Sequence, residues 1–152
     1  MVIDEADRRI LRVLQQDGRI TNQDLAQRCN LSASACFERT RRLRERGVIT
    51  GFATLLDPVM LERGLLIFVE VLLNRTTEDV FAAFARAAQN APEILECHMV
   101  AGGFDYLIKA RVKDMAAYRR FLGETLIPMP GVRETRTYAV LEEVKNSFVL
   151  PV

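Results

Sequence analysis

A run of arginines is the feature of this sequence whose residue type and spacing could do chemistry. Residues 31–47, LSASACFERTRRLRERG, place five of them within two helical turns, at Arg39, Arg41, Arg42, Arg44 and Arg46. The formal net charge of the whole chain is only +1. Guanidinium groups form paired hydrogen bonds to phosphate oxygens and to the O6 and N7 atoms of guanine. The run therefore indicates a polyanionic partner, and duplex DNA presents both kinds of acceptor.

The distribution of charge along the chain supports this interpretation. Residues 1–50 carry ten arginines and seven acidic residues, a net charge of +3, whereas residues 51–152 carry eleven basic and thirteen acidic residues, a net charge of −2. A polyanion should therefore meet the first third of the chain. The plainer alternative is a solvated helix on which Glu38 and Glu45 pair with nearby arginines, each pair contributing about 0.2–0.5 kcal/mol.

Three short helices are predicted to position these arginines. Apolar residues recur at helical spacing from Asp4 to Gln16, and Thr21 is suited to cap a second helix. Asn30 suits a tight turn, Ser32 can cap a third helix, and Gly47 can end it. This arrangement is a helix-turn-helix unit, with the third helix in the place of the recognition helix.

The predicted third helix has two different faces. Cys36, Thr40 and Leu43 share one face and should pack inward, while polar residues with long side chains lie opposite. The N-terminus of this helix carries serines, and backbone N–H groups there favour a phosphate oxygen. We therefore expect DNA contacts from Ser32, Ser34, Glu38, Arg39, Arg41 and Arg42.

The rest of the chain alternates between strand and helix patterns. We expect an extended hinge strand within 48–58, strands over 65–73, 94–100, 106–112 and 132–144, and helices over 76–90 and 114–127. This β-α-β-β-α-β order is the ferredoxin-like arrangement, so the predicted fold class is α+β. The predicted domains are a helix-turn-helix domain at 1–50, a hinge strand and linker at 51–62, and a ferredoxin-like domain at 63–152.

One face of such a sheet remains uncovered by its two helices. The predicted strands LLIFVEVLL (65–73) and YLIKARV (106–112) are apolar on both sides, which does not suit a face in water. We therefore expect a homodimer that buries this face. A two-fold dimer would also place two recognition helices in major grooves about 34 Å apart.

Other classes of function find little support in the sequence. No apolar run is long enough to cross a bilayer, and the charged start MVIDEADRRI differs from a signal peptide, so we expect a cytoplasmic protein with no membrane partner. Cys29, Cys36 and Cys97 are too scattered for a disulfide framework or a metal cluster, and His98 should point away from Cys97. No nucleophile, base and phosphate loop occur together, so we expect no catalytic residue, metal or cofactor. An enzyme that uses Cys97, His98 or Asp105 is the weakest alternative.

Together these segments resemble one known family. The resemblance is carried by IDEADRRILRVLQQDGRITNQDLAQRCNLSASACFERTRRLRERGVITGFATLLDP, LLIFVEVLLNR, ECHMVAGGFDYLIKARVKDM and PGVRETRTYAVLEEVK, which are similar to the Lrp/AsnC family of bacterial leucine-responsive or feast/famine regulators. It covers nearly the whole chain and is especially close to the leucine-responsive branch. It implies a transcription regulator of amino-acid metabolism that dimerises through its C-terminal domain and assembles into octamers or other multimers of dimers.

The resemblance also implies that a small effector, an amino acid, binds in the C-terminal domain between dimers. By position, the effector loop is Gly102, Gly103, Phe104, Asp105 and Tyr106, with Met115, Tyr138 and Val140 contributing from the pocket wall or a neighbouring subunit. Glycines let backbone groups approach a ligand closely, and Asp105 can accept a hydrogen bond from an α-ammonium group. Without the resemblance, Gly102-Gly103 would indicate a hairpin turn that requires positive φ.

The chain departs from the family pattern at two places. Gly103 stands where close relatives carry an acidic residue, and SASAC replaces SPTPC at the start of the recognition helix. The resemblance therefore leaves the effector amino acid and the base preference open. The main alternative to a ligand-responsive regulator is an architectural protein that wraps DNA with little base selectivity and keeps only a vestigial effector loop.

Overall fold

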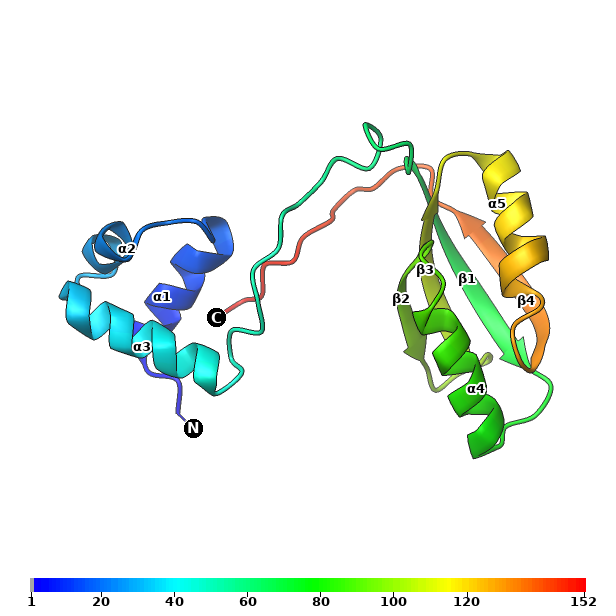
Figure 1. Ribbon diagram of the computed structural model, residues 1–152, viewed down its shortest axis with the longest axis horizontal. Coiled ribbons are helices and arrows are strands. Elements are labelled where there is room, and N and C mark those ends of the chain that lie inside the picture. The colour runs from blue at the N-terminus through cyan, green and yellow to red at the C-terminus, as the bar shows by residue number, and fades with distance from the viewer. Residues whose placement is uncertain (1) are drawn as a thin grey trace. The chain divides into compact units, whose positions relative to one another are not determined.

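The computed structural model describes residues 2–152 as two compact units (Figure 1). The first unit holds the residues up to Leu55 together with Lys145–Val152, and the second unit holds Leu56–Val144. None of the helices in the described part of the chain is long and apolar enough to span a membrane.

The first unit contains the three expected helices, α1 (Glu5–Gln16), α2 (Asn22–Arg28) and α3 (Ala33–Glu45). Asp4, Thr21 and Ser32 each cap one of them, because each side chain accepts a hydrogen bond from the backbone N–H three residues later, at 2.8, 3.1 and 3.2 Å. Asn30 and Gly47 adopt left-handed conformations, with φ of +52° and +70°. The predicted caps and the turns that end the second and third helices are therefore confirmed.

A small apolar core holds the three helices together. Its central members are Ile10, Leu25, Cys29, Cys36 and Leu43. Cys36 and Leu43 confirm the predicted inward face of α3. Burial raises the pKa of the Cys29 and Cys36 thiols, so both act as small apolar side chains.

The last residues of the chain also belong to the first unit, which corrects the predicted extent of the second domain, 63–152. The Gln15 amide binds both backbone polar groups of Leu150. Its Oε1 accepts from the Leu150 N–H at 2.6 Å, and its Nε2 donates to the Leu150 carbonyl at 3.1 Å. Val152 packs against the helical core. Gln15 and Leu150 lie 135 residues apart, so local periodicity could not reveal this contact.

The second unit folds as β1 (Leu65–Leu73), α4 (Glu78–Gln89), β2 (Ile94–Met99), β3 (Tyr106–Val112), α5 (Met115–Phe121), a π-helical turn η1 (Leu122–Leu126) and β4 (Val132–Ala139). Its strands form one antiparallel sheet in the order β2-β3-β1-β4. Helices α4 and α5 lie on the same face of that sheet (Figure 1). The unit therefore has the predicted β-α-β-β-α-β fold of class α+β.

Strand β1 organises the core of the second unit. Ile67, Val69 and Val71 alternate along it and are completely buried on the face that the helices cover. They pack in one cluster with Phe84 of α4 and Tyr118 of α5. Strand β1 also pairs with β3 on one side and with β4 on the other, so it joins the sheet to the layer of helices.

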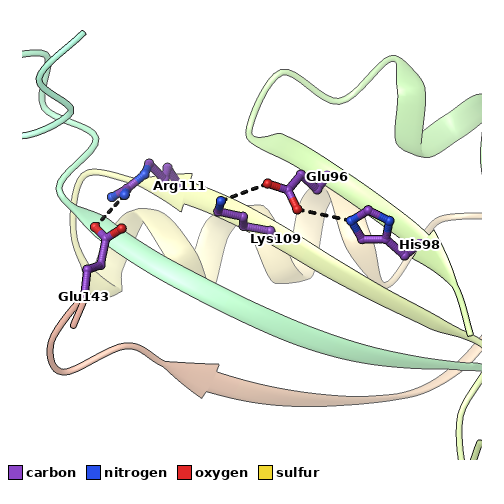
Figure 2. A network of polar contacts seen from close by, with 5 residues as sticks. All are labelled: Glu96, His98, Lys109, Arg111 and Glu143. Atoms are coloured by element: carbon purple, nitrogen blue, oxygen red, sulfur yellow. Dashed lines mark hydrogen bonds and ion pairs between the residues drawn. The ribbon is translucent and has the colours of Figure 1, made fainter. Parts of the chain in front are cut away.

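The uncovered side of the sheet, here called the open face, is mixed in character. Phe68 and Leu72 alternate with the core residues of β1 and make part of it apolar, as expected. The neighbouring strands add charge, because Glu96 accepts a hydrogen bond from Lys109 at 2.8 Å and lies 3.1 Å from His98 (Figure 2). Hydrogen bonds from Lys109, and then His98, lower the pKa of Glu96. The open face is thus less apolar than the sequence predicted.

Two expected strands are absent or shorter. Residues 51–57 form no strand with any described part of the chain, which corrects the predicted hinge strand. A strand requires hydrogen bonds from a neighbour, and these residues find no such partner strand among residues 2–152. Strand β4 ends at Ala139 rather than at residue 144, and beyond it Glu143 pairs with Arg111 (Figure 2).

Gly131, just before β4, provides a test of this packing. Its φ is +77°, and a Cβ atom there would lie 2.5 Å from Val80 Cγ1. We expect Gly131→Ala to lower the free energy of unfolding by about 1–3 kcal/mol, through backbone strain and displacement of Val80. Gly123→Ala is the control, since an added Cβ there meets nothing within 4 Å. Urea denaturation checks both variants, and equal midpoints would contradict the packing described.

Candidate DNA-binding and effector-binding sites

The N-terminus of α3 is exposed and held in a fixed conformation. Ser32 caps the helix, and its hydroxyl lies 3.2 Å from the hydroxyl of Ser34. Asn22 of α2 donates a hydrogen bond to the Ala33 carbonyl at 2.9 Å, which ties the start of α3 to the preceding helix. The two serines predicted to contact DNA therefore stand together in solvent, beside the backbone N–H groups of the first turn.

Arg39 differs from the other predicted DNA contacts. Its Nη1 donates to Asp4 Oδ2 at 2.7 Å and to Asp7 Oδ1 at 2.8 Å, and its side chain is only 25% exposed. These two carboxylates raise the pKa of Arg39, so it is charged at any physiological pH. Arg39 thus joins α3 to the start of α1. The structure places it in the framework of the unit and separates it from the exposed candidates.

Arg41 lies on the exposed side but is not free. Its Nη2 contacts Glu38 Oε2 at 2.8 Å, and its Nη1 contacts Glu45 Oε1. All three side chains are about half exposed, so each pair contributes little to stability. The alternative explanation of the arginine run, a solvated helix whose glutamates pair with nearby arginines, therefore holds for Arg41. DNA could recruit Arg41 by competing with these carboxylates.

Arg42 is an exposed arginine of α3 that is available to a partner. Neither it nor Arg44 or Arg46 forms an ion pair with any residue between 2 and 152. Sequence reasoning missed Phe37, whose side chain is 56% exposed on the outward side of α3. It lies three residues after Ser34 and four before Arg41, so a helical wheel could have found it. An exposed aromatic ring there can contact a thymine methyl group.

Asp105 closes the effector loop onto the end of β1. Its backbone N–H donates to the Val71 carbonyl at 3.0 Å, and its Oδ2 accepts from the Leu73 N–H at 2.7 Å. The ladder between β1 and β4 shifts register between Leu72 and Leu73. Asp105 thus binds a backbone group at an irregular point of the sheet, while its Oδ1 accepts no hydrogen bond from the described residues.

The structure of this chain does not require glycine at either of the two glycine positions of the loop. Gly102 and Gly103 do not adopt positive φ, and an added Cβ at either would meet no atom within 4 Å. The hairpin turn with positive φ, which was the alternative explanation, is therefore wrong. The space beside the backbone of both residues is open, so a ligand or another molecule could approach the backbone there.

Of the other residues predicted for the effector site, Tyr106 turns its side chain away from the loop, and Met115 and Tyr138 lie elsewhere. Tyr106 is only 4% exposed and packs its ring 4.6 Å from that of Phe84, so its side chain belongs to the core. Met115 begins α5 at the far end of β3 and is half exposed. Tyr138 donates to Glu70 Oε1 at 3.0 Å on the open face. Within one chain these residues form no single pocket.

The remaining predicted contributor, Val140, lies at the end of the sheet away from the loop. Its N–H donates to the Leu66 carbonyl at 3.0 Å, near the start of β1, whereas the loop meets the other end of that strand. The positions of these residues in the family pattern predict that they belong to one site. Their separation means that a second subunit would have to complete it.

Comparison with known protein families covers both units. Residues 3–50 match a winged helix-turn-helix DNA-binding model, and residues 66–150 match the Lrp/AsnC ligand binding domain. The leucine-responsive regulatory proteins of Escherichia coli K12 and Klebsiella pneumoniae are each 55% identical over 145 residues, which is 95% of this chain and 88% of each relative.

Solved structures give the same result. The transcriptional regulator NMB0573 of Neisseria meningitidis, in complex with L-Met, has a TM-score of 0.94 at 37% identity, covering 99% of this chain and 97% of that one. An AsnC family regulator from Agrobacterium tumefaciens has a TM-score of 0.93 at 31% identity, covering 97% and 96%. The chain belongs to the Lrp/AsnC family of transcription regulators, which are not enzymes.

Proposed function

We propose that this protein regulates genes of amino-acid metabolism by binding duplex DNA through α3, and that an amino-acid effector alters its assembly or DNA affinity. The observation that carries the proposal is the outward side of α3, where Ser34, Phe37 and Arg42 are exposed on a helix whose opposite side is buried. A DNA-binding regulator of this kind acts in the cytoplasm. The NMB0573 structure with L-Met supports the class of effector.

The residues predicted to contact DNA have two roles: the first is contact with the duplex, and the second is support of the recognition helix. Ser32, Ser34 and Arg42 face a phosphate or base edge directly, and Phe37 adds an apolar contact. Arg41 and Glu38 form an adjustable pair that can reorganise on the duplex. Arg39 holds the recognition helix in place through α1 and takes no part in reading DNA.

Arg42→Ala tests the first role. We expect it to weaken binding to duplex DNA by about 1–3 kcal/mol, because the substitution removes a cation that no carboxylate among the described residues neutralises. Arg119→Ala, at an exposed position of α5, is the matched control and should leave affinity unchanged. Electrophoretic mobility shift at fixed salt measures both variants. Equal affinity of Arg42→Ala and the wild type would contradict this assignment.

Arg39→Met tests the second role. It leaves Asp7, whose side chain is only 10% exposed, without its cation. We therefore expect a lower melting temperature of the first unit, with DNA affinity at low temperature close to that of the wild type. Far-UV circular dichroism and differential scanning calorimetry follow the folding. A variant that melts like the wild type but loses DNA binding would instead make Arg39 a direct contact.

The effector loop supplies groups suited to an α-amino acid. Asp105 Oδ1 can accept from the α-ammonium group, and the unobstructed backbone of Gly102 and Gly103 can approach the ligand. Phe104, which also belongs to this loop, is partly buried. The side chain of Tyr106 supports the loop from the core.

The effector site requires more than one subunit. Met115, Tyr138 and Val140 lie away from the loop of their own chain, so a neighbouring chain would bring them to it. The exposed apolar side chains of Phe52, Leu55 and other residues of the linker also favour association with a second copy. We therefore propose a homodimer that joins further dimers, as an octamer or another multimer.

Asp105→Asn tests the effector site without disturbing the loop. The asparagine Oδ1 can still accept from the Leu73 N–H, but the negative charge that would bind an α-ammonium group is lost. We expect DNA binding to persist while the response to amino acids falls at least tenfold in sensitivity. Asp114→Asn, which keeps the cap of α5, is the control. An unchanged response in Asp105→Asn would rule out this role for the carboxylate.

A further inference from the structure

A cavity of about 280 Å³ lies in the second unit, apart from the effector loop. It is bounded by the end of β3, by one side of α5 and η1, and by the connection between α4 and β2. The residues that matter for its chemistry are Glu93, Val112, Arg120, Phe121 and Glu124. Such a volume can hold a molecule of about the size of a free amino acid.

The charged groups of this cavity are not neutralised by one another. Glu93, Arg120 and Glu124 form no ion pair with any residue of the described chain. Two other cations at the cavity are engaged, since Lys113 pairs with Glu62 at 2.6 Å and Arg63 donates to the Glu62 carbonyl at 3.2 Å.

A π-helical turn follows α5 at this cavity. Arg120 lies in the last turn of α5 and Glu124 in η1, and the two side chains do not form an ion pair. Turns of this kind are frequent at functional sites. Arg120 and Glu124 thus present an exposed cation and an exposed carboxylate at the cavity.

The lining of the cavity is mostly polar, and Val112 and Phe121 supply a small apolar part of it. Val112 and Phe121 are 3% and 4% exposed, and both belong to the core of the second unit. Opposite charges around such a cavity suit a zwitterion, because each charged end of the ligand meets an opposite charge.

The cavity is distinct from the effector loop. The loop precedes β3 at Tyr106, whereas the cavity lies at Val112, where β3 ends. At about 3.3 Å per residue, the two places are roughly 20 Å apart along the strand. One amino acid could not occupy both within a chain.

We infer that this cavity is a second binding site for a free α-amino acid. The carboxylate of the ligand binds Arg120, its α-ammonium group binds Glu93 with Glu124 nearby, and its side chain lies over Phe121 and Val112. The inference rests on the proposed function only for the class of ligand. Each chain would then carry two amino-acid sites, one at the effector loop and one on the side of the sheet that the helices cover.

Isothermal titration calorimetry of the full-length protein with each of the twenty standard L-amino acids tests this inference. For an amino acid that binds, we expect two sites per chain in the wild type and one in Asp105→Asn. In the Asp105→Asn background, Arg120→Gln and Glu93→Gln should each weaken the remaining site at least tenfold. Arg119→Gln, an exposed arginine of α5 outside the cavity, should leave it unchanged.

The possible results separate this inference from the proposed function. If the wild type binds one amino acid per chain and Asp105→Asn binds none, the effector loop is supported and the second site is wrong. If binding survives Asp105→Asn but is lost in Arg120→Gln and Glu93→Gln, the second site is supported even if the loop site fails. Binding that no cavity variant affects, or the absence of binding by all twenty amino acids, overturns the inference.

Discussion

A helix that reads DNA must bury one side firmly and leave the other side free, and the first unit is built around this constraint. Cys36 and Leu43 bury one side of α3 in a core that is small, because only three short helices contribute to it. Arg39 strengthens the attachment by binding two carboxylates at the start of α1. Because Arg39 ties α3 to α1, Arg42 and its neighbours lie on a helix whose orientation is fixed.

The second unit meets a similar requirement with a sheet. Strand β1 pairs on both sides and presents its alternate residues to the helices, so the effector loop is attached to the end of a strand that is held by both neighbours. Asp105 makes that attachment through one carboxylate oxygen and leaves the other available. The open face combines apolar side chains with the Glu96 and Lys109 pair, so the proposed contact between subunits has charge to set its register.

Most of the fold could be predicted because it depends on local patterns. Ser32 and Gly47 mark the ends of a helix through their own chemistry, and alternation along β1 identifies its inward face. Alternation would also have placed Tyr106 in the core with Ile108, had it been applied to the last residue of the loop. What local patterns could not provide were partners distant in the chain.

The distant partners account for the main corrections. Arg39 meets Asp7 across 32 residues, and Gln15 meets Leu150 across 135. Neither contact leaves a periodic trace in the sequence. The absence of a hinge strand has the same origin, because a strand depends on a neighbour, and residues 51–57 have no such neighbour in the described part of the chain.

The central claim, a regulator that reads sequence and responds to an amino acid, is tested most directly by fluorescence anisotropy on the unaltered protein. A labelled duplex from upstream of its own gene is titrated at two salt concentrations, with and without each amino acid, against a random duplex of equal length. We predict preference for the upstream duplex by about 10³ or more and a shift of affinity with one or two amino acids. Equal binding to both duplexes, steeply weakened by salt and indifferent to every amino acid, would contradict the account and indicate an architectural DNA-wrapping protein.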